Sequence, residues 1–363
     1  MKILVVQDYL RSGGTERQSV LLANAFAAAG HETTLLTFRP GGALAGTVSS
    51  KVRRHSLQPF DCGLDWFAPG LARFVHRLSP DVVLCMGRMA NCHAGSLSRA
   101  TGPVVIATMR TGKSLPYLFR RSLHRCRHVV ANSAEARDTL TRTYGVAAAR
   151  VSVIHNSLVF PATTAAGATT RAAIRAAHGA SADTSVLICV AMFRPEKNQR
   201  ELIEVVAGLP AGKRWQLWLA GDGPARAECE RLVAARGLMS QIKFLGFQKD
   251  PSALLAGADI AVHASQSEAL SNFLIEAQAH GLPFVASEAQ GVRECGRPDE
   301  TAWVISRHDR DAFRQTLLAR MNDPLPVRAR QAAAAQAYAR DTFDPARQVA
   351  AYLELFERQA EQG

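Results

Sequence analysis

Several features that define other protein classes are missing from this chain. No run of about 18 consecutive apolar residues is present, so the sequence predicts no membrane-spanning helix. The first residues, MKILVVQDYL, lack a signal-peptide cleavage pattern and predict a first strand. The seven cysteines form neither a C-x-x-C pair nor a spacing with histidine that suits a metal. We therefore expect reduced thiols in a cytosolic protein and no structural zinc site.

Negative charge is scarce in the first part of the chain. Residues 1–160 hold 20 Lys and Arg against 8 Asp and Glu, whereas residues 161–363 hold 23 of each. The whole net charge of +12 therefore lies in the N-terminal half. This half is either a soluble basic domain or a surface that meets an anionic partner, such as a lipid surface, a phosphorylated acceptor or a nucleic acid.

A length of 363 residues exceeds what one hydrophobic core usually supports, so we expect two domains. Apolar runs such as KILVVQ and DVVLCMG alternate with helical stretches, which is typical of a doubly wound parallel sheet. The alternation pauses in the small residues 161–183, a linker in which RAAIRAAHG is also compatible with a short helix. The sequence predicts two Rossmann-like α/β domains, residues 1–160 and 161–344, with a ligand cleft between them.

Two glycines follow the first predicted strand, in Ser12-Gly13-Gly14-Thr15-Glu16-Arg17. Glycine allows a tight turn, and the helix that follows offers free backbone N–H groups to an anion. Arg17 stands near the position where a dinucleotide fingerprint has its third glycine, so the G-x-G-x-x-G motif is not met. A phosphate-binding loop and an ordinary turn explain the two glycines equally well.

Three segments follow predicted strands of the second half, at the sheet edge where α/β proteins bind ligands. In Arg194-Pro195-Glu196-Lys197, two cations three residues apart suit a diphosphate, although a plain basic loop before a helix would look the same. Gly221-Asp222-Gly223 suits either a ligand loop or a tight turn before a helix. Phe247 follows a glycine at a strand end and suits either a nucleobase contact or an ordinary strand exit.

Two carboxylates stand eight positions apart in SQSEALSNFLIEAQAHG. Glu268 belongs to the loop after the strand DIAVHAS, and Glu276 is expected in the first turn of the helix Phe273–His280. Glu276 would accept hydrogen bonds from the vicinal hydroxyls of a ribose, and Glu268 would face a second hydroxyl-rich group. Helix capping is the alternative, and it explains Glu276 but not Glu268. The loop residues expected to face a diphosphate between the two acids are Ala269, Leu270, Ser271 and Asn272.

In combination these motifs resemble the retaining glycosyltransferases of family 4, which have the two-domain GT-B fold. Glu268 and Glu276 match the family's E-x7-E pattern, and GGTE is similar to its GG-x-E donor loop. Arg194 and Lys197 are similar to its R-x-x-x-K element, one residue tighter. The resemblance covers nearly the whole chain. It departs in ATMRTG, where many members have a histidine and this chain has Arg110.

The resemblance implies transfer of a sugar from a nucleotide donor, most often UDP-linked, with retention at the anomeric carbon. It implies a role in the synthesis of a surface glycan, a lipopolysaccharide or a lipid-linked oligosaccharide. The implied catalytic residues are Arg194, Lys197 and Glu268, and the implied donor-binding residues are Gly13, Gly14, Arg110, Gly221, Phe247, Ala269, Leu270, Ser271, Asn272 and Glu276. No metal and no other cofactor is implied, and Asp309-Arg310-Asp311 is interpreted as a helix cap. The alternatives are a sugar-nucleotide epimerase or phosphorylase of the same fold, and a non-catalytic nucleotide-sugar-binding protein.

The segment Ser114–Arg127 mixes apolar side chains with four arginines. This composition suits a helix at a membrane interface, and it equally suits a helix whose apolar face lies in the core. The charge asymmetry and the resemblance both favour the membrane. We therefore expect a cytoplasmic protein bound peripherally to the inner face of the cell membrane through its N-terminal domain. Its acceptor would be a glycan or a lipid-linked molecule, and no nucleic acid would be bound. The amphipathic residues 345–363 are expected to pack back on the N-terminal domain.

Overall fold

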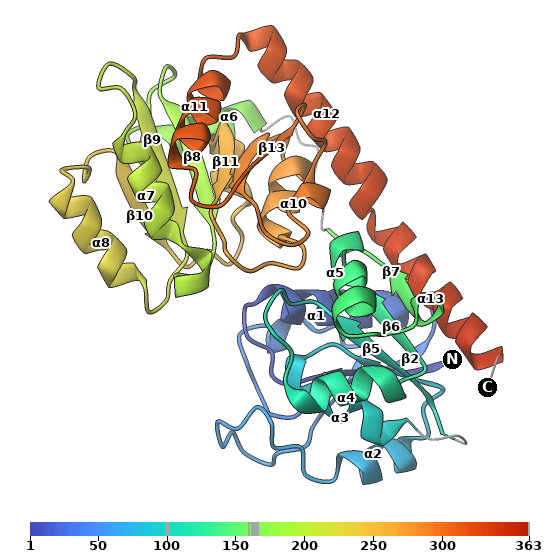
Figure 1. Cartoon of the computed structure of the whole chain (residues 1–363). Coiled ribbons are helices and arrows are strands. Elements are labelled where there is room, and N and C mark those ends of the chain that lie inside the picture. The colour runs from blue at the N-terminus through green and yellow to red at the C-terminus, as the bar shows by residue number, and fades with distance from the viewer. Residues whose placement is uncertain (99–101, 159, 161–166, 362–363) are drawn as a thin grey trace. The chain divides into compact units, whose positions relative to one another are not determined.

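The structure is a computed structural model that describes residues 1–98, 102–158, 160 and 167–361. The chain divides into two compact units: an N-terminal unit of residues 1–157 and 345–363, and a C-terminal unit of residues 158–344. Each unit is built on one parallel sheet with helices on both faces (Figure 1). The predicted class of two Rossmann-like α/β domains is confirmed.

The sheet of the N-terminal unit has seven strands in the order β3-β2-β1-β4-β5-β6-β7. Because helices cover both faces, the central strands are buried on both sides, and this is why they appear in the sequence as continuous apolar runs. The strands are β1 (Lys2–Gln7), β2 (Glu32–Thr37), β3 (Arg53–Ser56), β4 (Val82–Cys85), β5 (Val104–Met109), β6 (His128–Ala131) and β7 (Val151–Val153).

The two faces of this sheet carry different helices. Four helices pack on one face: α2 (Leu71–Leu78), α3 (Arg88–Leu97), α4 (Tyr117–Arg125) and α5 (Ala134–Asp138). On the other face lie α1 (Gly14–Ala28) and the C-terminal helix α13 (Pro345–Glu361). The centroid of the Phe26 ring lies 6.2 Å from the ring centroid of Tyr352 and 5.5 Å from that of Phe356. The last helix of the chain is therefore part of the N-terminal core.

The C-terminal unit has a six-stranded sheet in the order β10-β9-β8-β11-β12-β13. Its strands are β8 (Ser185–Val190), β9 (Trp215–Ala220), β10 (Ile242–Gly246), β11 (Ile260–His263), β12 (Phe284–Ser287) and β13 (Ala302–Ile305). The helices on one face are α6 (Gly167–Ala177), α9 (Ser252–Gly257), α10 (Asn272–Ala279) and α12 (Leu325–Phe343). Those on the other face are α7 (Gln199–Ala207), α8 (Arg226–Ala235) and α11 (Arg310–Met321).

Two details of the C-terminal unit bear on the sequence interpretation. The helix α6 occupies the middle of the segment expected to be a linker, residues 161–183, and residues 161–166 of that segment lie outside the described residues. Asp309 caps α11, since its carboxylate accepts a hydrogen bond from the backbone N–H of Ala312 at 2.9 Å. The interpretation of the Asp309-Arg310-Asp311 triplet as a helix cap is confirmed.

Candidate active site

The polar loops singled out in the second half of the sequence all follow strands of one parallel sheet, so they meet at its carboxyl edge. The loop after β8 carries Arg194 and Lys197, and the loop after β11 carries Glu268. Gly221 follows β9 directly, and Phe247 follows β10. The structure therefore gathers these predicted residues on one edge of the C-terminal unit.

Lys197, Glu268 and His263 form a cluster at the centre of this edge, and the last two of these residues are buried. The Nζ of Lys197 pairs with Oε1 of Glu268. The Nε2 of His263, the last residue of β11, lies 2.8 Å from the same oxygen. His263 is 1% exposed and Glu268 is 9% exposed, so this carboxylate meets its two partners away from bulk water. Bonds to an ionised group are stronger than neutral ones, so the geometry holds Glu268 in one orientation.

The protonation state of Glu268 follows from this environment. Burial raises the pKa of the carboxyl group, but the charge of Lys197 and the hydrogen bond from His263 outweigh burial and lower the pKa to about 2. Glu268 is therefore a carboxylate at neutral pH. An ionised carboxylate carries no proton to donate, but it accepts hydrogen bonds. Glu268 therefore suits binding hydroxyl groups rather than acting as a proton donor.

Arg194 is the second cation of the edge and stands in a different situation. It is half-buried, and its side chain makes no ion pair with any residue in the described part of the chain. Its positive charge is consequently less compensated than that of Lys197. An anionic ligand at this edge would meet the guanidinium of Arg194, which can hold two phosphate oxygens at once.

The loops after β8 and β11 are tied together through the backbone of one residue. The carbonyl oxygen of Glu196 accepts a hydrogen bond from the N–H of Gln266 at 2.8 Å and from the hydroxyl of Ser265 at 3.2 Å. These contacts bring Lys197 and Glu268 together although 71 positions separate them in the chain. The spacing of the pair is thus fixed by the sheet and by loop hydrogen bonds.

Gly221 is required by its surroundings. Its backbone φ is +145°, and a Cβ atom built on it would lie 2.0 Å from the carbonyl oxygen of Ala191. Gly291, after β12, is constrained in the same way, because a Cβ there would lie 1.9 Å from the carbonyl oxygen of Ala269. Both glycines let neighbouring loops approach each other closely along the edge. For Gly221 this packing role accounts for the residue without any ligand.

The loop from Ala269 to Asn272 leads into α10. Ala269 and Leu270 are buried, and the hydroxyl of Ser271 accepts from the N–H of Leu274 at 3.4 Å as the helix cap. Since α10 begins at Asn272, Glu276 is the fifth residue of the helix and not part of its first turn. The prediction that Glu276 lies in the first turn is wrong, because the helix begins at Asn272, one residue before its apolar run.

Two other predicted donor-binding positions differ in exposure. Glu276 is half-buried on α10, and its backbone carbonyl accepts from Nδ1 of His280 at 2.9 Å. Phe247 is 55% exposed beyond the glycine that ends β10. An exposed aromatic ring at a strand's carboxyl end is available for stacking, whereas one in an ordinary strand exit would pack inward.

In the N-terminal unit, Gly13 and Gly14 stand at the carboxyl end of β1 and begin α1. Gly13 is the N-cap residue and has no side chain to satisfy the first N–H groups of the helix. A Cβ on Gly13 would lie 2.5 Å from Oε2 of Glu16, the end of a flexible side chain. The helix start thus has the glycine turn expected of an anion-binding loop, with the carboxylate of Glu16 beside it.

Arg110 is engaged inside the N-terminal unit. Its guanidinium donates to Oδ1 of Asn156 at 2.5 Å and to the phenol oxygen of Tyr352 at 2.6 Å. Tyr352 belongs to α13, so Arg110 joins the C-terminal helix to the end of β5. The structure places Arg110 in a contact that secures α13, and a donor contact would have to compete with it.

His263 is the member of the cluster that sequence reasoning missed. In the sequence it looks like one polar residue at the end of the strand DIAVH, and no motif marks it. Its separation of five positions from Glu268 is the only available signal, since a strand end and the loop that follows can fold back on each other. Among the described residues, no group of three or more His, Cys, Asp and Glu side chains is arranged to hold a metal.

Two family models match the chain in succession. Residues 12–158 match the model described as Glycosyltransferase Family 4, and residues 170–340 match that of Glycosyl transferases group 1. The lipopolysaccharide core biosynthesis glycosyltransferase LpsE of Rhizobium meliloti is 32% identical over 143 residues, which are 39% of this chain and 41% of that protein. The chain thus matches less than half of this relative's length.

Two further proteins are similar over most of their length. The GDP-mannose-dependent alpha-(1-6)-phosphatidylinositol dimannoside mannosyltransferase of Mycobacterium tuberculosis is 28% identical over 339 residues, 85% of this chain and 84% of that protein. HepE of Anabaena, solved in complexes with UDP and with UDP-glucose, superposes with a TM-score of 0.82 for the UDP complex. That match covers 99% of this chain and 100% of HepE at 22% identity, which establishes the similarity of fold.

Proposed function

Because the chain belongs to glycosyltransferase family 4 and has the GT-B fold, we propose that it transfers a sugar from a nucleotide-diphosphate donor to an acceptor. The observation that carries this proposal is the edge of the C-terminal unit, where Glu268 is paired with Lys197 and His263 and where Arg194 stands in the same loop as Lys197. In this proposal the anomeric configuration is retained, and the donor is a UDP-sugar.

The chemistry of these residues suits the proposed reaction. The bond from the anomeric carbon to the donor's phosphate oxygen breaks, and a bond from that carbon to the acceptor oxygen forms. Negative charge develops on the leaving diphosphate, and Arg194 and Lys197 would stabilise it. The donor's own phosphate oxygen would take the acceptor's proton, so a separate basic side chain is not needed.

The carboxylates take the two sugars of the donor. We assign the donor sugar to Glu268, which is fixed and ionised, and the ribose to Glu276 on α10. The amides and side chains of Ala269–Asn272 would lie beside the diphosphate, and Phe247 beside the base. Gly13 and Gly14 are proposed as a further anion-binding turn in the N-terminal unit.

The proposed acceptor is a growing surface glycan, a lipopolysaccharide core or a lipid-linked oligosaccharide. The name of the R. meliloti relative and the lipid acceptor named for the M. tuberculosis relative support this class. The M. tuberculosis relative is named for the donor GDP-mannose, whereas HepE was solved with UDP-glucose. The nucleobase of this chain's donor is therefore a matter for the donor screen described below.

We also propose peripheral association with the inner face of the cell membrane. No helix among the described residues is long and apolar enough to span a bilayer.

A donor screen tests the proposal. The purified protein is incubated with UDP- and GDP-sugars and with membrane lipid extracts, and products are identified by mass spectrometry. A glycosylated acceptor, lost in the Glu268→Gln variant, is the expected result. Free epimerised sugar nucleotide would instead indicate an epimerase, and phosphate-dependent cleavage a phosphorylase. Donor binding without any turnover, hydrolysis included, would leave a binding protein.

The assignment of Glu276 has its own test. The ribose contact is made equally in the ground state and in the transition state, so Glu276→Ala should weaken nucleotide binding and change turnover little. Calorimetric titration with UDP measures this affinity directly, and an unchanged affinity would remove the ribose role.

The wild-type protein also provides a test of metal dependence. We propose that the cations replace a metal, so EDTA should leave activity intact.

A further inference from the structure

The exposed apolar side chains of the N-terminal unit concentrate in one loop. Residues 57–70 connect β3 to α2, and we call them the aromatic loop. Phe60 is 72% exposed and Trp66 57% exposed, and Leu64 and Phe67 are also exposed. These are four of the nine large hydrophobic side chains that are exposed in the described part of the chain. Apolar side chains gathered in this way on a surface mark a binding site more often than chance exposure.

The backbone of the aromatic loop is fixed by one buried side chain. The amide nitrogen of Gln58 donates to the carbonyl oxygen of Leu64 at 2.8 Å and to that of Phe67 at 2.7 Å. The thiol of Cys62 contacts the Oε1 of Gln58 at 2.9 Å. Gln58 itself is 1% exposed. The loop is therefore held in the conformation that keeps its aromatic rings outward.

The acids of the loop are neutralised by arginines from other segments. Arg39 binds Asp61 through two nitrogens at 2.7 and 2.9 Å and Asp65 at 2.7 Å, and Arg11 also binds Asp65 at 2.7 Å. The guanidinium groups of both arginines lie over the ring of Tyr9. The hydrogen bonds with Arg39 lower the pKa of Asp61 to about 2. Both acids are consequently paired, and the loop presents no unbalanced negative charge.

The chain around the loop is almost free of acids. Residues 66–133 contain ten Lys and Arg and one acid, Asp81. Asp81 accepts from the backbone N–H of Lys2 at the start of the sheet. The exposed arginines of the helices in this stretch are Arg73 and Arg77 on α2, Arg88 on α3, and Arg120, Arg121 and Arg125 on α4. A surface of this charge attracts an anionic partner.

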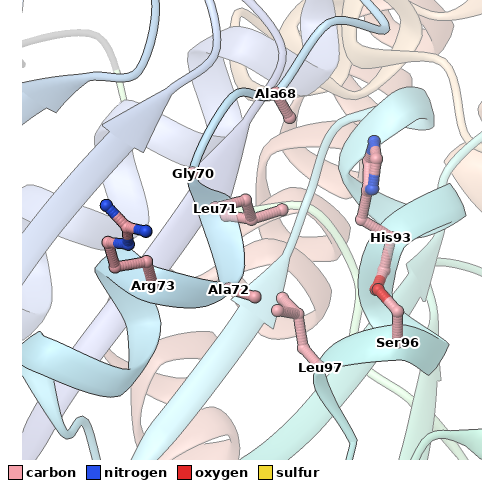
Figure 2. A pocket seen from close by; sticks show the side chains of 8 residues that line it. All are labelled: Ala68, Gly70, Leu71, Ala72, Arg73, His93, Ser96 and Leu97. Atoms are coloured by element: carbon pink, nitrogen blue, oxygen red, sulfur yellow. The ribbon is translucent and has the colours of Figure 1, made fainter.

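A cavity of about 600 Å³ adjoins the loop at the start of α2 and along α3. In Figure 2, Leu71, Ala72 and Leu97 lie between Arg73 and His93. The Nε2 of His93 is 3.4 Å from the carbonyl oxygen of Trp66, so α3 and the aromatic loop border the same hollow. The apolar loop, the hollow and the cations of α2 thus form one continuous surface.

We propose that the aromatic loop and the arginines of α2 bind the surface of an anionic bilayer. The rings of Phe60, Trp66 and Phe67 enter the headgroup region, and Arg73 and Arg77 bind lipid phosphates. Aromatic side chains favour this region because it is apolar on one side and polar on the other. Cations beside them add attraction to anionic lipid that falls with salt. This inference rests on the proposed membrane association and names the element responsible for it.

The helix that the sequence singled out for this role is mostly core. Leu115, Phe119 and Leu123 are buried against the sheet, which leaves Tyr117 and Leu118 as the exposed apolar residues of the segment. The cations of α4 remain exposed, so α4 adds charge to the surface but has little apolar area to insert. The aromatic loop supplies that area.

Vesicle sedimentation tests the inference with matched variants. The probes are phosphatidylcholine vesicles with and without about 30% phosphatidylglycerol. The triple variant Phe60→Ser, Trp66→Ser and Phe67→Ser should weaken binding to the anionic vesicles by about tenfold or more. The control is Met239→Ser with Leu325→Ser, which changes two large apolar residues that are exposed on the C-terminal unit. This control should bind like the wild type. Arg73→Gln with Arg77→Gln should weaken binding most at low salt.

A spectroscopic measurement reports on the loop itself. Trp66 is the most exposed of the four tryptophans, so brominated lipid should quench its fluorescence and Trp66→Phe should abolish that quenching. Sugar transfer to a detergent-dispersed acceptor should be unchanged in all these variants, which separates this inference from the proposed function. Equal binding to neutral vesicles, retained binding in the loop variant, or loss of binding only in Tyr117→Ser with Leu118→Ser would overturn it. So would a response of Trp66 to an acidic glycan but not to vesicles.

Discussion

The Nε2 of His263 lies 2.8 Å from Oε1 of Glu268, in a site where both side chains are buried. The same oxygen is paired with Lys197, so one carboxylate oxygen takes one donor from the end of β11 and one from the loop after β8. The other ring nitrogen of His263, Nδ1, has no hydrogen-bond partner among the described residues. His263 is therefore specialised for this contact. It fixes the orientation of a carboxylate that the proposed mechanism needs to hold a sugar.

Replacing His263 should separate orientation from charge. In His263→Leu, Glu268 keeps Lys197 but loses a charge-assisted hydrogen bond of about 1.5–3 kcal/mol, so turnover should fall roughly ten- to a hundredfold. His263→Asn retains a donor of shorter reach and should recover part of the loss. Steady-state kinetics with the natural donor measure both. Equal losses in the two variants would show that the ring's volume matters and its hydrogen bond does not.

Lys197 and Arg194 should behave differently when removed. Lys197→Ala leaves Glu268 buried without its cation, so it should cost about 3 kcal/mol of stability as well as most of the turnover. Arg194→Ala breaks no ion pair with a described residue, so it should lower turnover about a hundredfold with stability changed by less than about 0.5 kcal/mol. Thermal melts and rates of the same preparations give both quantities. Normal turnover in Arg194→Ala would refute its contact with the diphosphate.

The general architecture was predictable because it depends on patterns that a sequence displays directly. Strands such as Ile3–Val6 and Val82–Cys85 are buried on both faces and are apolar throughout. The β-strand Arg53–Ser56 was missed because an edge strand has one neighbour and little burial, and this one is polar. The helix α12 was missed because its buried positions are Gln331, Ala335, Ala339 and Phe343, a face with little hydrophobic contrast.

The site was predictable to the extent that single residues mark it. Arg194, Lys197 and Glu268 follow strands, and a parallel sheet brings strand ends together whatever the loop lengths are. The partner of Glu268 was not predictable, because the contact with His263 depends on how the loop after β11 folds back. The apolar face of Ser114–Arg127 was ambiguous for a related reason: the sequence of an amphipathic helix does not state what its apolar face packs against.

Arg110 offers a test of a structural role against a binding role. Arg110→Ala removes two hydrogen bonds, to Asn156 and Tyr352, and should cost about 2 kcal/mol of stability. Tyr352→Phe removes one of them and should cost about half as much. Arg125→Ala, at an exposed position, is the control. If Arg110→Ala weakens donor binding and Tyr352→Phe does not, then Arg110 contacts the donor in addition to α13.

Gly221 should tolerate no side chain. Alanine at this position would place a Cβ 2.0 Å from the carbonyl oxygen of Ala191 in a backbone conformation that L-residues rarely adopt. We expect Gly221→Ala to lower stability by about 3 kcal/mol or more and to lower activity through the displaced loop. Gly212→Ala is the matched control, because nothing lies within 4 Å of a Cβ at that turn. Equal melting temperatures for the two variants would contradict the packing role.

Asp8, at the carboxyl end of β1, should make stability depend on pH in the direction opposite to that of an ordinary paired acid. Its carboxylate accepts from the backbone N–H groups of Met89 at 3.0 Å and Ala90 at 2.7 Å. Burial nevertheless raises the pKa of Asp8 from 3.8 to about 6. The folded state thus binds the proton more tightly than the unfolded state does. The contribution is fully present below about pH 3.8 and is lost as the pH rises through about 6.

The variant Asp8→Asn cannot ionise and should not show this loss. A shift of about two pKa units corresponds to about 3 kcal/mol. Asn forfeits part of this, because its amide nitrogen accepts no hydrogen bond and one of the two N–H groups loses its partner. We expect Asp8→Asn to be less stable than the wild type at pH 4.5 and more stable at pH 7.5. The exposed Asp299→Asn should show no such crossover. Denaturant melts at both pH values make the comparison. A wild-type protein that remains the more stable of the two at pH 7.5 would mean that the bonds to α3, and not burial, govern the ionisation of Asp8.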